Sequence, residues 1–393
     1  MPALAAGFQS SEKTAIVNPA AFTASLCMNV IVKTACTGKI YQRVQNRPLL
    51  SFMLQKTKII VVVLAVLIAV VFLFIKLPDN QNSNSYQSPP PFETRYEAIN
   101  GRVVEKAIAD LRPLAVVVEN HPDARPQSGL SEADIVYESL AEGGITRFLA
   151  IFQSPGGEEI GPVRSAREYF ASLADEWGAL FAHVGGSNEV ITQLKAGRYK
   201  NLDDANEYYN FDFFPRRKDK PEPHHIFTST QKLKNLIKYH QFSGLAVYQP
   251  WIFKEDQPVA SSTASKVSID FSRPGYEVGW EYDSLRNAYK RLQYFQPHID
   301  AISKTQILAK AVVVQIVRVT PVPKDPLLQV DIGLNEGGRA LVFQDGIVVN
   351  GTWRRENGRT RFYDSVNAEI EFNRGSIWLE LVPKDKAQNL KWN

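Results

Sequence analysis

The chain is organised around one apolar stretch, IIVVVLAVLIAVVFLFI, at residues 59–75. As a helix, its seventeen apolar residues would span about 25 Å, close to the shortest length that crosses a hydrocarbon core. Lys56 and Lys58 precede the stretch, and Lys76 follows it. A buried core helix is the alternative, but such helices rarely run this long without a polar residue. We therefore expect residues 59–77 to form a transmembrane signal anchor.

The charges beside this stretch predict its orientation. The only acid before it is Glu12, and after Lys76 no basic residue occurs before Arg95. Positive residues stay on the cytoplasmic side of a membrane, so we expect a cytoplasmic N-terminus and extracytoplasmic C-terminal domains. Neither a small-residue cleavage pattern nor a cysteine that could be lipidated follows the stretch, which favours an uncleaved anchor. The basic residues before it are Lys13, Lys33, Lys39, Arg43, Arg47, Lys56 and Lys58.

The segment before the anchor, residues 1–58, has two interpretations. It is a cytoplasmic tail, or translation naturally starts at Met53, which opens the positively charged sequence MLQKTK. In the second case residues 1–52 are translated upstream sequence. N-terminal sequencing of the native protein distinguishes the two.

Composition excludes several classes of protein. The net charge is only +4, and no long basic block or aromatic-basic repeat suggests nucleic-acid binding. Both cysteines, Cys27 and Cys36, precede the apolar stretch. The part after it therefore has no disulfide, no cysteine nucleophile and no thiolate metal site.

After the anchor we expect a disordered tether at 78–96, an α/β domain with a mixed sheet at 97–250, a linker at 251–265 and a mainly β domain at 266–385. The tether is rich in Asn, Ser, Gln and Pro. Strands and helices follow from hydrophobic periodicity and turn signals. Expected strands of the first domain are 114–119, 135–140, 145–153 and 180–184, with helices at 165–175, 187–194 and 228–240. The expected strands of the second domain are 267–271, 277–282, 311–319, 328–334, 339–343, 346–349 and 377–382.

Several long motifs give the chain a family resemblance. The stretches at 119–154 (ENHPDARPQSGLSEADIVYESLAEGGITRFLAIFQS) and 161–170 (GPVRSAREYF) resemble the YerB-like family of bacterial envelope lipoproteins. So do GTWRR, TRFYD and GSIWLELVP, which begin at Gly351, Thr360 and Gly375. The resemblance covers about residues 100–385 and implies a two-domain, membrane-tethered protein that faces the cell wall. This chain departs from the lipid-anchored members because no cysteine that could be lipidated follows the apolar stretch, and it is expected to use a helix as its anchor instead. The resemblance assigns no catalytic residue.

The sequence GPVRSARE, which enters an expected helix, is the densest polar cluster. Free N–H groups and the helix dipole favour an anion there. Arg164 and Arg167 would share one face of the helix and hold a phosphate or carboxylate, with Ser165 as the N-cap. The alternative is plain capping together with ion pairs to Glu168 or Glu142.

A second cluster surrounds a Gly-Gly turn. Glu138 and Glu142 could act as acid and base on a glycan, and Arg147 follows them. We name Glu142 as the candidate catalytic residue. Structural ion pairing of these hairpin charges is the alternative.

Other candidate ligand-binding residues lie at strand ends, where α/β folds gather ligands. Asn120 and Arg125 follow the expected strand 114–119. His183 lies at the end of another strand of the same domain, and we expect it to meet them. The alternative for His183 is a buried histidine that is satisfied by backbone groups.

The 208–217 loop could stack sugars or fold over the core, and Arg216 is its candidate binding residue. Its aromatic and basic residues are Tyr208, Tyr209, Phe211, Phe213, Phe214, Arg216 and Arg217.

No metal or cofactor is expected. His224 and His225 lie close to Glu222, but adjacent histidines point apart and no third ligand has a recognised spacing. The chain has no Gly-rich phosphate loop, HExxH or GxSxG motif.

Together these observations predict a membrane-anchored, extracytoplasmic envelope protein that binds an anionic or glycan wall polymer. The alternatives are a cell-wall hydrolase or phosphoryl-transfer enzyme, and a scaffold for an envelope-synthesis partner.

Overall fold

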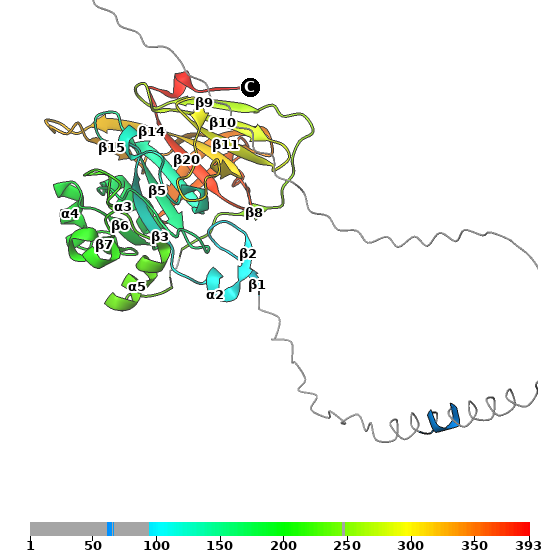
Figure 1. Cartoon of the computed structure of the whole chain (residues 1–393). Helices are drawn as coiled ribbons and strands as arrows, with labels where there is room; N and C mark the ends of the chain where they lie inside the picture. Colours follow the sequence, from blue (N-terminus) through cyan, green and yellow to red (C-terminus); the bar gives the residue numbers. More distant parts are fainter. Residues whose placement is uncertain (1–60, 65, 67–93, 246–247) are drawn as a thin grey trace, which may run out of the picture. The chain divides into compact units, whose positions relative to one another are not determined.

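The computed structural model describes residues 61–64, 66, 94–245 and 248–393, and those from Thr94 onward belong to one compact unit (Figure 1). Within the expected anchor, 61–64 and 66 are helical. The rest of residues 59–77, the expected tail with its second start and most of the expected tether lie outside the described residues. No helix in the described part of the chain is long and apolar enough to cross a membrane. The predicted single transmembrane helix is therefore not supported.

One large mixed sheet contains strands from both halves of the chain. Its order is β18-β17-β16-β14-β20-β4-β5-β3-β6-β7, and β15 pairs with β14 outside this path. The first half supplies β3 (Leu114–Glu119), β4 (Ile135–Leu140), β5 (Thr146–Phe152), β6 (Leu180–His183) and β7 (Asp203–Asn206). The second half supplies β14 (Ala311–Pro321), β15 (Val330–Gly333), β16 (Gly338–Gln344), β17 (Ile347–Glu356), β18 (Arg359–Asp364) and β20 (Ile377–Pro383).

The two halves meet where β4 pairs with β20. The strands are parallel, and their register runs from Ile135 opposite Ile377 to Ser139 opposite Leu381. On either side of this pair, β5 and β14 continue the sheet. The sheet is thus continuous from one half of the chain to the other.

A second, antiparallel sheet covers one face of the large sheet. It comprises β9 (Lys266–Asp270), β10 (Glu277–Asp283), β11 (Ala288–Gln293), β12 (Gln296–Pro297), β13 (Leu308–Ala309) and β21 (Lys391–Trp392). Because successive side chains of a strand point to opposite faces, the large sheet has two cores. Leu114, Val116 and Val118 of β3 join the core shared with the second sheet and α5 (Thr230–His240). Ala115 and Val117 join the core shared with α3 (Glu168–Glu176).

The helices are few and short. Ser187 and Ser229 cap α4 (Asn188–Lys195) and α5 by accepting bonds from the N–H groups of Val190 and Lys232, as short hydroxyl side chains do at helix starts. The described chain also contains α2 (Lys106–Ala109), β1 (Thr94–Tyr96), β2 (Val103–Glu105), β8 (Phe253–Lys254), β19 (Phe372–Asn373) and the 3-10 turns η1 (Pro122–Ala124), η2 (Leu130–Glu132), η3 (Glu207–Tyr209), η4 (Phe211–Phe213) and η5 (Ala387–Asn389).

The expected α/β class is wrong, because the fold is mostly β-sheet. Hydrophobic periodicity correctly indicates α3, α4 and α5, but an α/β fold also needs crossover helices between parallel strands. Here β4 and β5 form an antiparallel hairpin, and β3 pairs antiparallel with β5. The link between β3 and β4 contains only the 3-10 turns η1 and η2.

Candidate functional site

The three residues of the expected anion site precede α3 and do not lie on one helix face. Arg167, with extended backbone, is the residue before the helix, so Ser165 is not its cap. The Arg167 Nη2 atom donates to Glu142 Oε2 at 2.7 Å, and Arg164 Nε lies 3.1 Å from Glu119 Oε1. Each arginine thus has its own carboxylate partner, and the pair forms no common clamp.

Glu142, the candidate catalytic residue, is held by two arginines. Its other oxygen accepts a bond from Arg147 Nη2, and Arg147 is buried together with Arg167. Burial lowers the pKa of Arg147 to about 10, although the charge of Glu142 opposes this shift. With both oxygens bound to guanidinium groups, Glu142 has the geometry of a structural ion pair.

Asn120 and Arg125 belong to a network behind the end of β3. The Asn120 side chain donates to Thr146 Oγ1 at 2.7 Å and to Glu138 Oε1 at 3.2 Å. Arg125 Nε donates to Asn120 Oδ1 at 3.0 Å, and its Nη2 donates to the Gly275 carbonyl at 2.9 Å. Burial lowers the pKa of Arg125. This network joins β3, β4 and the second sheet.

His183 lies at the end of β6 and is fully buried. Its Nδ1 atom is 2.6 Å from the Gly185 carbonyl, and its Nε2 atom is 2.7 Å from Asp204 Oδ1. Both ring nitrogens are therefore occupied, and His183 does not meet Asn120 or Arg125 in these contacts.

Arg216 is engaged within its own loop. It forms an ion pair with Glu207, and its guanidinium carbon lies 4.4 Å from the centroid of the Phe211 ring. Tyr208 and Tyr209, beside this group, are 78% and 61% exposed. The loop therefore presents aromatic rings to solvent, but both of its arginines, Arg216 and Arg217, are already paired with carboxylates.

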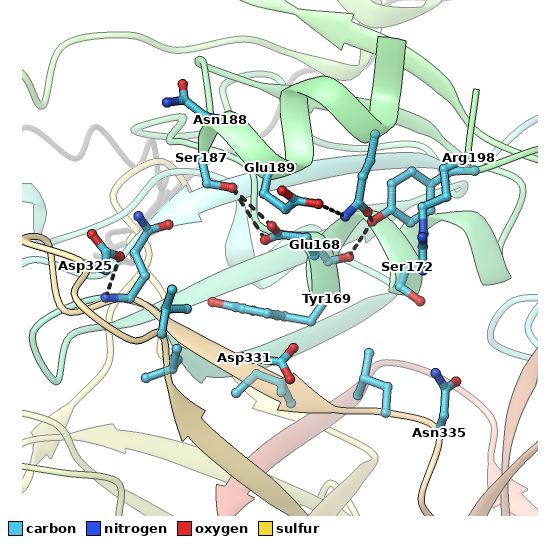
Figure 2. A pocket seen from close by; sticks show the side chains of 17 residues that line it. Glu168, Tyr169, Ser172, Ser187, Asn188, Glu189, Arg198, Asp325, Asp331 and Asn335 are labelled. Atoms are coloured by element: carbon cyan, nitrogen blue, oxygen red, sulfur yellow. Dashed lines mark hydrogen bonds between the residues drawn. The ribbon is translucent and has the colours of Figure 1, made fainter. Parts of the chain in front are cut away.

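A cavity lies elsewhere, between α3, α4 and the β14–β15 connection, with a volume of about 680 Å³ (Figure 2). This volume is within the usual range for ligand pockets. Polar groups of several kinds line it. Its carboxylates are Glu168, Glu189, Asp325 and Asp331, its amides are Asn188, Gln193, Gln329 and Asn335, and its hydroxyls are Ser172, Ser187, Tyr169 and Tyr199. Val322, Val330, Ile332 and Leu334 add apolar surface, and Arg198 is the one guanidinium in the lining.

Internal contacts hold one wall of this pocket in place. Ser187 Oγ lies 3.4 Å from both oxygens of Glu168, and Tyr199 Oη lies 2.9 Å from Gln193 Oε1. Burial raises the pKa of Tyr199 to about 12, so its hydroxyl keeps its proton. Beneath them, Tyr169 donates to the Leu140 carbonyl at 2.7 Å. These residues offer a fixed set of donors and acceptors.

Other groups in the pocket are free to bind a ligand. Within the described part of the chain, the structure gives the side chains of Asn188 and Arg198 no hydrogen-bond or ion-pair partner, and both residues are exposed. In Figure 2 Asn188 and Arg198 lie on opposite sides of Glu189. Sequence patterns do not indicate this pocket, because its two walls come from segments more than one hundred residues apart. The only local signal was the Ser187 cap.

Sequence profiles identify the family. Residues 99–243 match the family described as "Protein of unknown function (DUF3048) N-terminal domain", and residues 267–379 match the corresponding C-terminal domain. The chain therefore belongs to the DUF3048 family. Its relative in Bacillus subtilis (strain 168), named "Putative lipoprotein YerB", is 34% identical over 330 residues, which is 82% of this chain and 96% of the relative. The YerB-like resemblance is thus confirmed.

A solved structure has a similar fold. The crystal structure of the YerB protein from Bacillus subtilis matches with a TM-score of 0.67 and 32% identity, and the match covers 75% of this chain and 98% of that one. This relationship is consistent with an envelope-associated protein. It also corrects the predicted localisation, because the relative is named a lipoprotein and the described residues contain no membrane-spanning helix. A single-pass protein with a cytoplasmic N-terminus is not supported.

Proposed function

We propose that this envelope-associated protein binds a glycan in the pocket between α3, α4 and the β14–β15 connection. The observation that carries the proposal is the combination of groups in the lining. Carboxylates and amides can accept and donate bonds to sugar hydroxyls, and the side chains of Val322 and Val330, which keep accessible surface in the lining, can cover the apolar face of a sugar ring. Ligand sites typically combine apolar walls with a few convergent polar groups in this way.

The charge of the pocket favours a neutral or amino-bearing glycan over an anionic polymer. Four carboxylates line it against one guanidinium, so a chain of phosphates or uronates would be repelled. The arginines first considered for an anion, Arg164 and Arg167, have carboxylate partners of their own. Of the two polymer types expected from the sequence, the glycan therefore fits better.

The enzyme and scaffold alternatives have less support. A hydrolase that uses Glu142 needs a carboxyl group able to exchange a proton, whereas both oxygens of Glu142 accept bonds from arginines. Phosphoryl transfer by Arg164 and Arg167 has little support for a similar reason, because both guanidinium groups already bind carboxylates. A scaffold for an envelope-synthesis partner needs no ligand pocket. A test for glycan binding therefore distinguishes the scaffold alternative from the proposed function.

Calorimetric titration of the full chain tests the proposal. The probes are chitotetraose as a neutral glycan and poly(glycerol phosphate) as an anionic polymer. The blocking variant is Glu189→Trp, and the matched control is Gln231→Trp. Glu189 and Gln231 are each the second residue of a helix that a serine caps. Each side chain also forms a hydrogen bond with the side chain four residues later in its helix.

Support for the proposal is binding of chitotetraose that Glu189→Trp weakens at least tenfold and Gln231→Trp leaves unchanged. Binding of poly(glycerol phosphate) alone would overturn it. Failure to bind either polymer would favour the scaffold. Mass spectrometry of cell walls incubated with the protein completes the test, because released fragments that disappear with Glu142→Gln would identify a hydrolase.

A further inference from the structure

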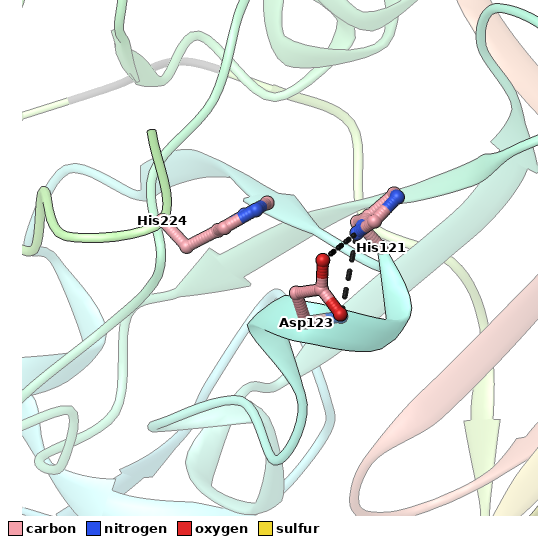
Figure 3. A group of neighbouring side chains, drawn as sticks. All are labelled: His121, Asp123 and His224. Atoms are coloured by element: carbon pink, nitrogen blue, oxygen red, sulfur yellow. Dashed lines mark hydrogen bonds and ion pairs between the residues drawn. The ribbon is translucent and has the colours of Figure 1, made fainter. Parts of the chain in front are cut away.

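A second polar cluster lies at the end of β3, apart from the pocket. His121 caps the turn η1 shortly after the strand, Asp123 lies within this turn, and His224 comes from a distant segment (Figure 3). One ligand atom from each of the three lies within 4.8 Å of the other two. We propose that these residues form a binding site for a divalent transition metal, with Zn²⁺ as the best match.

Backbone pairing brings the distant segments together. Val118 of β3 bridges to Val163, and the Val163 N–H group donates to the Ile226 carbonyl at 2.7 Å. The 161–163 segment therefore lies between the end of β3 and the segment that contains His224. This pairing makes His121 and Asp123 neighbours of His224, although about one hundred residues separate them in the sequence.

The buried histidine is oriented as metal-binding histidines are. His224 is only 8% exposed, and its Nδ1–H group donates to Glu119 Oε2 at 2.7 Å. An ionised carboxylate can only accept, so this bond leaves the lone pair of His224 on Nε2. Among the described residues, no hydrogen-bond partner is found for that atom. A carboxylate that holds the second nitrogen of a histidine is the usual outer shell of a zinc ligand.

The other two ligands are more exposed and can adjust. The side chains of His121 and Asp123 are 34% and 68% exposed, and the His121 ring stacks on His224 with 5.3 Å between centroids. Ligand atoms in a tetrahedral zinc site are about 3.3 Å apart. Asp123 and His121 must therefore move inward by a small distance, while Glu119 keeps His224 in place.

The charge and type of the ligands define the metal. Two neutral imidazoles and one carboxylate carry a single negative charge, and the Glu119 charge is balanced by Arg164 at 3.1 Å. Such a His₂-carboxylate set suits Zn²⁺ or Fe²⁺ and not the oxygen-seeking Ca²⁺ or Mg²⁺. Three protein ligands leave a coordination position open for water or a ligand oxygen.

The test is calorimetric titration of ZnCl₂ into the full chain that carries Cys27→Ser and Cys36→Ser, so that thiolates cannot compete. One Zn²⁺ per chain should bind, and His121→Ala and Asp123→Ala should each weaken binding at least tenfold. The matched controls, His240→Ala and Asp212→Ala, should leave affinity unchanged. Asp212, like Asp123, lies in the first turn of a 3-10 helix.

His224→Gln keeps a donor for Glu119 and should abolish binding while circular dichroism still reports the folded chain. The absorption spectrum of bound Co²⁺ adds a direct readout of nitrogen ligands. Absence of stoichiometric binding would overturn the proposal. So would binding that survives both His121→Ala and His224→Gln, or that His240→Ala weakens equally.

Discussion

Glu138 and Glu380 occupy paired positions on the adjacent parallel strands β4 and β20, and both side chains are completely buried. Arg291 of the second sheet forms an ion pair with Glu138, and Trp280 Nε1 donates to Glu380 Oε1 at 2.9 Å. Burial, together with the charge of Glu138, raises the pKa of Glu380 well above its ordinary value. Burial and the neighbouring carboxylate thus both favour the protonated form of Glu380, while Arg291 pairs with Glu138.

Replacing Arg291 should destabilise the protein strongly. Arg291→Met leaves the Glu138 charge buried without its partner, and breaking a buried ion pair costs about 3–5 kcal/mol. Urea denaturation followed by circular dichroism measures the free energy of unfolding. The control is Arg318→Met, because the exposed Arg318 pairs with Glu336 at the surface and should matter little. Equal losses in the two variants would contradict the assigned role of Arg291.

Stability should depend on pH through Glu97. Burial, with a further contribution from Asp134, raises the pKa of Glu97 from 4.5 to about 7. The folded state thus binds the proton more tightly than the unfolded chain. This stabilisation is complete below about pH 4.5 and is lost as pH rises through about 7, by at most about 1.4 kcal/mol per pH unit.

Glu97→Gln cannot ionise, so the variant should lose less stability between pH 5 and pH 8 than the parent. The measurement is the urea midpoint at both pH values, with the exposed Glu105→Gln as control. If the parent and Glu97→Gln lose the same amount, another group is responsible.

Glu142 should contribute to stability and not to ligand binding. Glu142→Gln removes the carboxylate between the buried Arg147 and Arg167, so we expect a loss of about 1–3 kcal/mol in the free energy of unfolding. Chitotetraose affinity of the folded variant should stay at the parent value. The exposed Glu158→Gln should change neither quantity, and loss of glycan affinity in Glu142→Gln would count against the pocket.

Glu119 should act as a positioning residue for the proposed metal site. Glu119→Gln keeps an oxygen acceptor for His224 but removes the charge, which typically weakens metal binding about 10–100-fold. Zinc titration measures this change, and the Co²⁺ spectrum should still show nitrogen ligands. Glu207→Gln, a buried acid with its own arginine, is the control. An unchanged zinc affinity in Glu119→Gln would show that His224 needs no such orientation.

Local patterns in the sequence predict single elements well and their partners poorly. The run LAVVVE predicts β3, and Ser187 predicts the start of α4, because periodicity and capping act within a few residues. Pairing of β4 with β20 joins residues more than two hundred positions apart. No local signal encodes that register, so the continuous sheet could not be predicted.

The same limit applies to the candidate sites. Arg164 and Arg167 are close in sequence and suggest a clamp, but distant acids, Glu119 and Glu142, pair with them separately. His224 has no recognisable third ligand in its own segment, because His121 and Asp123 reach it through strand pairing. Short spacing identifies chemical groups, while long-range pairing decides which of them meet.

The pairing of β4 with β20 also constrains how this family can evolve. If either half were lost, β4 or β20 would become an unpaired edge strand, which favours aggregation. The two profile-matched regions, residues 99–243 and 267–379, are therefore expected to be inherited together. Recombination that shuffled one of them into another protein would transfer half of a sheet.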